Sequence, residues 1–90
     1  MTTAQIERPL VLRRIGSIIG AVVGQPELVV SDTTRAEQVR GWDSLAHVSI
    51  VLNVEKAYGM RLKAAEVARL ENVGSLVDIV LARGKLCVIP

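Results

Sequence analysis

The stretch Gly41-Trp42-Asp43-Ser44-Leu45-Ala46-His47-Val48 decides the fold, because a loop-like segment gives way there to a long helical pattern. We expect Asp43 or Ser44 to be the N-cap, since short polar side chains accept hydrogen bonds from the free amides of a first helical turn. A serine in this first turn is exposed, and the unpaired N–H groups beside it favour negative charge. The stretch therefore predicts a helix start at which Ser44 can carry a phosphate ester.

Four helices are predicted along the chain. Apolar residues repeat at spacings of three and four over residues 9–23, and the helix that follows Asp43 should cover about 44–58, with Gly59 as its stop. A short helix is expected over 64–70, and a longer one over 73–83. The chain thus predicts an all-α fold, a small four-helix bundle of three longer helices and one short helix.

A long connection over residues 25–42 separates the first two helices and is rich in turn-forming residues. Loops of this length are usually functional or packed down by their own side chains. Residues 28–30 could form a short strand, although no partner strand is evident. We expect a single domain over residues 1–84 and a flexible C-terminal tail over 85–90.

The composition is that of a single small domain. The chain has 90 residues, half of them hydrophobic, so a core can form without disulfides or metal. One cysteine excludes an internal disulfide and a cysteine-based zinc site. The net charge of +2 is mildly basic, but the basic residues are scattered rather than gathered in a nucleic-acid-binding stripe. Since neither a signal peptide nor a bilayer-spanning apolar run is evident, we expect a cytoplasmic protein without membrane contact.

The helix after Ser44 is apolar on two faces when its side chains are placed at about 100° per residue. In so small a domain one face can pack in the core, whereas the second has little to cover it. We therefore expect Leu45, Val48 and Leu52 to form an exposed recognition surface beside Ser44. The alternative is that Val48 and Leu52 pack on the long loop. The core face consists of His47, Ile50, Val51, Val54 and Tyr58.

The chain resembles the acyl carrier protein family over roughly residues 7–83. The resemblance rests on the stretch 41–48, on the length of the following helix with its second apolar face, and on the spacing to residues 66–67 and 72–76. It implies that Ser44 bears 4′-phosphopantetheine, which a phosphopantetheinyl transferase attaches from coenzyme A. The thiol of that arm would hold an acyl or aminoacyl group for loading and acceptor enzymes. A carrier of this kind is not an enzyme, needs no metal, and is expected to be a monomer.

The resemblance also suggests roles for the neighbours of Ser44. Asp43 either caps the helix or contacts the transferase, and Trp42 is expected to pack on the first turn. His47 is expected to be a half-buried side chain with a satisfied hydrogen bond rather than a ligand. Val67 would lie near the arm, where it lines the resting place of the cargo or packs in the core. The expected partner-binding residues are Leu45, Val48, Leu52, Glu55 and Val67.

The chain departs from the many family members that are strongly acidic along these helices. Glu55 is the acid that remains along the helix after Ser44, and Glu66 is the one within the short helix. Because negative charge steers basic partners, we expect a dedicated pathway carrier with apolar, less salt-sensitive contacts. The sequence of the motif resembles that of freestanding carriers of secondary-metabolite or polysaccharide pathways, rather than that of the housekeeping carrier of fatty-acid synthesis.

Two other classes of protein remain open at this point. The chain could be an unmodified helical adaptor that keeps the carrier fold. It could also be a small DNA-binding helical domain, although the helices lack a face of residues suited to reading base edges. A stand-alone hydrolase is disfavoured, because no acid, base and nucleophile converge in the sequence.

Overall fold

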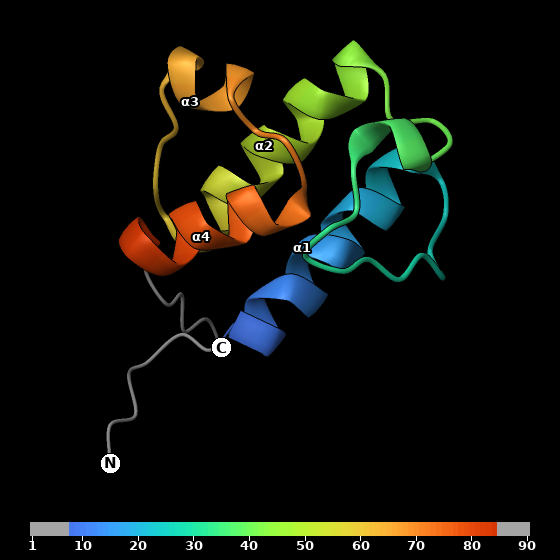
Figure 1. Cartoon of the computed structure of the whole chain (residues 1–90), viewed down its shortest axis with the longest axis horizontal. Helices are drawn as coiled ribbons and strands as arrows, with labels where there is room; N and C mark the ends of the chain where they lie inside the picture. The colour runs from blue at the N-terminus through green and yellow to red at the C-terminus, as the bar shows by residue number, and fades with distance from the viewer. Residues whose placement is uncertain (1–7, 85–90) are drawn as a thin grey trace.

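A computed structural model describes residues 8–84 of the chain. These residues form four α-helices and one 3-10 helix: α1 (Arg8–Val23), η1 (Ala36–Gln38), α2 (Ser44–Tyr58), α3 (Ala64–Ala68) and α4 (Val73–Arg83). Helix α1 packs against both α2 and α4, and the short α3 lies at the edge of the bundle (Figure 1). The predicted all-α fold of three longer helices and one short helix is confirmed. The tail 85–90, which was expected to be flexible, lies outside the described residues.

The core is built from the apolar faces of the three longer helices. No polar or charged residue in the described part of the chain is buried, so the interior is filled by aliphatic side chains and the ring of Tyr58. The long loop also contributes to the core, because Val30 and Val39 are buried with the helical residues. The buried cluster comprises Val11, Ile15, Ile19, Val30, Val39, Ile50, Val54, Tyr58, Val73, Leu76, Val77 and Val80.

Local capping sets the ends of α2. The Asp43 carboxylate accepts a hydrogen bond from the Ala46 amide at its start. At its end Gly59 adopts a left-handed conformation with φ 58°, which glycine takes without steric cost. The predicted bounds of α2 therefore hold. The prediction for the short helix was too long, since α3 ends at Ala68 rather than at residue 70.

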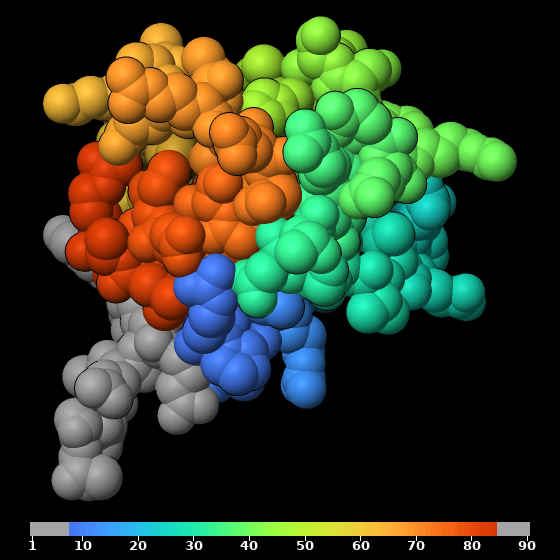
Figure 2. Space-filling view, in the orientation of Figure 1, coloured from blue at the N-terminus to red at the C-terminus, as the bar shows by residue number. Residues whose placement is uncertain are grey.

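The long loop between α1 and α2 is docked on the start of α4. The carbonyl oxygen of Asp32 accepts from the Gly74 amide and that of Thr34 from the Val73 amide, both at 2.8 Å. The Arg8 guanidinium donates to the carboxylates of Asp32 and Asp78, each at 2.7 Å. Loop residues accordingly lie against the starts of both α1 and α4 (Figure 2). No strand forms at residues 28–30, and η1 is a turn of helix that the sequence did not predict.

Gly74 permits this docking because it has no side chain. A Cβ atom at this position would lie 2.7 Å from the Asp32 carbonyl oxygen, closer than real Cβ contacts allow. The backbone of the loop can therefore reach the α4 amides only where the helix surface is bare. Residue 74 is thus fixed by tertiary packing rather than by helix propensity.

We expect Gly74→Ala to destabilise the domain by about 1–3 kcal/mol, the usual cost of overpacking, despite the better helix propensity of alanine. Urea unfolding measures the effect. Gly16→Ala is the matched control, because its Cβ would meet only the end of the Val30 side chain, at 3.1 Å. There the propensity gain of about 0.5–1 kcal/mol should offset the contact. Equal stabilities of parent and Gly74→Ala would contradict the role of the bare helix surface.

Helix α3 is held by its one acidic side chain. The Glu66 carboxylate accepts from the Lys63 backbone amide and from the Arg83 guanidinium of α4, both at 2.8 Å. Five residues are too few for an independently stable helix, so these bonds matter for its placement. The hydrogen bond from the Lys63 amide, followed by the one from Arg83, lowers the pKa of Glu66 below its ordinary value of 4.5.

The lowered pKa of Glu66 gives a pH-dependent stability. The ionised carboxylate stabilises the fold in full above about pH 4.5, and this contribution is lost as the pH falls through the lower pKa of the folded state. We therefore expect Glu66→Gln to lower the melting temperature at neutral pH. The gap, meaning the difference in melting temperature between variant and parent, should close in acid. Glu27→Gln, at an exposed loop position, is the control and should show a small gap at every pH. A gap for Glu66→Gln that does not change with pH would refute the expectation.

Candidate functional site

Ser44 is the first residue of α2 and is exposed. Asp43 is the N-cap, its side chain bound to the Ala46 amide at 2.8 Å and its carbonyl oxygen to the His47 amide at 2.9 Å. Within residues 8–84 the amides of Ser44 and Leu45 have no acceptor, as expected for the first turn of a helix. The serine hydroxyl therefore projects from a rigid helix end that is suited to a negatively charged group.

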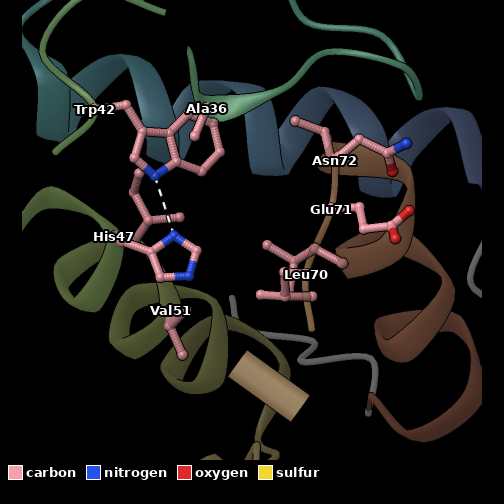
Figure 3. Close-up of a pocket in the computed structure, with 10 residues that line it drawn as sticks. Ala36, Trp42, His47, Val51, Leu70, Glu71 and Asn72 are labelled. Atoms are coloured by element: carbon pink, nitrogen blue, oxygen red, sulfur yellow. Dashed lines mark hydrogen bonds between the residues drawn. The ribbon is translucent and has the colours of Figure 1, made fainter. Parts of the chain in front are cut away.

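Trp42 and His47 form a bonded aromatic pair beside the serine. The indole Nε1 donates to His47 Nδ1 at 3.1 Å, and the rings stack with centroids 6.0 Å apart (Figure 3). Both side chains are half-buried, which agrees with the expected packing of Trp42 on the first turn and with a satisfied His47. The pair joins the last loop residues to the first turn of α2, so it fixes the direction in which the loop enters the helix.

Two hollows share the wall formed by Ala36, Trp42 and His47. The first is open, has a volume of about 410 Å³, and also includes Asp43 and Ser44. The second is a narrow cleft of about 30 Å³ between α2 and the segment that leads into α4. Figure 3 shows Leu70 across this cleft from His47 and Val51, with Glu71 and Asn72 beside Leu70. The aromatic pair thus separates the surface around Ser44 from the interior cleft.

The second apolar face of α2 is exposed. Leu45 is 79% exposed, Val48 53% and Leu52 52%. The alternative, in which Val48 and Leu52 pack on the long loop, does not occur. The three side chains therefore form an uncovered apolar strip that begins next to Ser44.

Of the two remaining expected contact residues, Glu55 lies beside the strip and Val67 lies on α3. Glu55 borders the strip and, with Leu52, lines an open hollow of about 470 Å³ at the end of α2. One of its carboxylate oxygens accepts from the Leu62 amide at 2.7 Å, so Glu55 also shapes the turn after α2. Val67 is half-buried on α3, and it belongs neither to the core cluster nor to the lining of the cleft. From this part of the chain it is Leu70, and not Val67, that lines the cleft.

Comparisons with known proteins bear on the class of this chain. No family model and no curated protein matched it. Among solved structures, the fold is similar to the solution NMR structure of the holo acyl carrier protein from Geobacter metallireducens, with a TM-score of 0.71. The two sequences are 30% identical, and the match covers 78% of this chain and 80% of that chain.

The chain belongs to the acyl carrier protein family. The predicted membership is therefore confirmed, and with it the prediction of a carrier protein rather than an enzyme. No group of metal-ligating side chains suited to a metal ion occurs within residues 8–84. The helices of this part of the chain are also too short or too polar to cross a membrane.

The sequence missed three features of the site. The hydrogen bond between Trp42 and His47 lies within a spacing of five residues and could have been suspected from two aromatic rings around a helix start. Ala36 enters the site through η1, which no local pattern marked. Leu70 lines the cleft because α3 ends early and the chain turns toward the Asn72 cap of α4, which the apolar pattern alone did not reveal.

Proposed function

We propose that this acyl carrier family member holds an acyl or aminoacyl group as a thioester on 4′-phosphopantetheine attached to Ser44. The observation that carries the proposal is the exposed serine at the capped start of α2, beside an open hollow and an apolar strip. The similar protein from Geobacter metallireducens is described as a holo acyl carrier protein, which supports the same modification here.

The residues around Ser44 fit such a group. The hydroxyl would form the phosphate ester, and the free amides of Ser44 and Leu45 would face the phosphate charge at the positive end of the helix. The open hollow beside the serine has room for the arm without rearrangement of the helix. When bound, the arm supplies a terminal thiol on which the cargo is carried. Asp43 holds the first turn in shape and is also proposed as a contact for the phosphopantetheinyl transferase.

The apolar strip is the proposed docking surface for the transferase and for the loading and acceptor enzymes. Leu45, Val48 and Leu52 supply its apolar contact area, and Glu55 borders it with a carboxylate. Val67, half-buried on the nearby α3, is the proposed outer edge of the same surface. With so few acids, this surface favours apolar over ionic recognition.

The small number of acidic residues on this surface also supports the proposed class of pathway. We assign the chain to a dedicated biosynthetic pathway, of the secondary-metabolite or polysaccharide kind, rather than to general fatty-acid synthesis. It would act as a monomer in the cytoplasm, where the coenzyme A that donates the arm is found. Membrane and nucleic acid are not among its proposed partners.

The attachment of the arm can be tested by intact mass. After incubation with coenzyme A, magnesium and a broad-specificity phosphopantetheinyl transferase, we expect the protein to gain the mass of one phosphopantetheine. Ser44→Ala should gain nothing and should stay folded, because the cap on Asp43 is untouched. Ser49→Ala, one turn further along α2, is the matched control and should gain the arm as the parent does.

The carrier proposal would be contradicted if two unrelated transferases both left the parent unmodified while its circular dichroism spectrum remained native. An adaptor that keeps the carrier fold would then be the better description. Modification of Ser44→Ala would instead place the arm on another residue.

If the strip is a docking surface, substitutions in it should weaken partner recognition without changing the stability of the domain. We expect Val48→Ala and Leu52→Ala each to change the free energy of unfolding by less than about 0.5 kcal/mol, as is usual for surface sites. Each should lower kcat/KM for arm transfer by roughly three- to tenfold, which corresponds to a contact of about 1 kcal/mol. Ile50→Ala, fully buried on the opposite face, is the contrast and should cost about 2–5 kcal/mol of stability. Large destabilisation by the two surface variants would mean that the strip is part of the core.

A further inference from the structure

The hydrogen bond from Trp42 fixes the protonation pattern of His47. An indole Nε1–H can only donate, so His47 Nδ1, 3.1 Å away, must be the unprotonated acceptor. A neutral imidazole carries its one proton on the other nitrogen in that case. His47 Nε2 is therefore an N–H donor, and it cannot accept.

This donor faces the cleft. In Figure 3 the second ring nitrogen of His47 points away from Trp42, into the space toward Leu70. It has no hydrogen-bond partner within residues 8–84, and no buried side-chain nitrogen or oxygen there is left unpaired, so this nitrogen is accessible to solvent. Much of the remaining lining is apolar and includes Ile50, Val51, Leu70 and Leu76.

The polar groups on the rim do not duplicate this donor. The Asn72 side-chain oxygen is engaged by the Ser75 amide and hydroxyl as the cap of α4. Its side-chain NH2 group is also a donor, but in Figure 3 that nitrogen points away from His47. Glu71 is exposed, and its carboxylate can only accept when ionised. An apolar cleft with one directed N–H in its wall selects a ligand that has an apolar body and one oxygen acceptor.

The size of the cleft further limits which ligands can fit. Its volume of about 30 Å³ corresponds to about two water-sized groups. A long alkyl chain exceeds this volume and would have to part α2 from the segment that leads into α4. A short acyl group needs only a rotation of Leu70, which is half-buried at the edge of the core.

We propose that this cleft binds the end of a short acyl cargo that carries a further oxygen besides that of the thioester, with His47 Nε2–H donating to that further oxygen. Trp42 acts as a positioning residue, because it holds the imidazole in the donor tautomer and in its orientation. The inference rests on the proposed attachment of the arm at Ser44, which lies one helical turn before His47 and beside the same aromatic pair.

The tautomer of His47 is tested on the protein without phosphopantetheine, so the result of this measurement does not depend on the proposed function. Long-range ¹H–¹⁵N NMR at alkaline pH, where imidazole is neutral, distinguishes the two ring nitrogens. We expect a protonated Nε2 and an unprotonated Nδ1 in the parent, and a mixture in Trp42→Phe, which keeps a stacking ring but lacks the donor. A dominant Nδ1–H form in the parent would overturn the proposal.

Cargo binding is tested on the protein loaded from coenzyme A thioesters, with intact mass confirming each arm. Three forms are compared: the free-thiol arm, butyryl and 3-oxobutyryl. We expect the 3-oxobutyryl form alone to shift the His47 Nε2–H and Trp42 Nε1–H resonances strongly, together with the Leu70 amide. Equal shifts with butyryl would refute a role for the oxygen. The same shifts with the free-thiol arm would show that an amide of the arm, rather than the cargo, occupies the donor.

Hydrolysis of the loaded thioester gives a second readout. The 3-oxobutyryl form of the parent should hydrolyse more slowly than the 3-oxobutyryl form of His47→Phe, by roughly two- to tenfold for one hydrogen bond, whereas the butyryl forms of the two proteins should hydrolyse at the same rate. Asn53→Ala, exposed on the same helix, is the control and should keep this protection from hydrolysis. If His47→Phe does not fold, Trp42→Phe should reduce the protection in proportion to its loss of the donor tautomer. Unchanged protection in a folded His47→Phe would overturn the proposal.

Discussion

The structure depends on two backbone hydrogen bonds between the long loop and the start of α4. The carbonyl groups of Asp32 and Thr34 take up the amides of Gly74 and Val73, which would otherwise be unpaired at a helix N-terminus. The loop thereby lies over the core, buries Val30 and Val39 and arrives at Trp42 in a fixed direction. Because Gly74 presents a bare helix surface, this contact can be made at backbone distance. The position of Ser44 is in this sense set by α4, a helix far from it in the sequence.

Helix α2 carries both the packing and the surface of the site. Its period of 3.6 residues places Ile50 and Val54 in the core while Leu45, Val48 and Leu52 stay in solvent. The cap on Asp43 starts the helix, and the left-handed Gly59 ends it. Ser44 is therefore mounted on a rigid element at the point where the loop, the apolar strip and the aromatic pair meet. A carrier needs little else from its fold, because the reactive atoms belong to the arm and to the partner enzymes.

The parts of the fold that local chemistry controls could be predicted from the sequence. The start and end of α2 follow from Asp43 and Gly59, and the start of α4 follows from Asn72, each through one short-range interaction. The course of the loop could not be predicted, because it depends on bonds between residues about forty positions apart. The same holds for η1 and for the early end of α3. Leu70 was likewise not predicted as a site residue, because it is the chain turn after α3 that brings it to the cleft. The site residues on α2 were within reach of sequence reasoning, and those brought in by tertiary contacts were not.

The acidic residues have mostly structural tasks, which bears on how partners are recognised. Within residues 8–84, five carboxylates are hydrogen-bonded inside the fold. They cap helices, brace the turn after α2 and pair with Arg8 or Arg83 across elements; they are Asp32, Asp43, Glu55, Glu66 and Asp78. A carboxylate that is already bonded offers a partner less free charge than a solvated one, and exposed ion pairs add little affinity. What α2 offers freely is its apolar strip. If partners dock there as proposed, their specificity would come from the shape and packing of Leu45, Val48 and Leu52 rather than from a steering field. That requirement is easier to meet for a few co-evolved pathway enzymes than for the broad set that a general fatty-acid carrier serves.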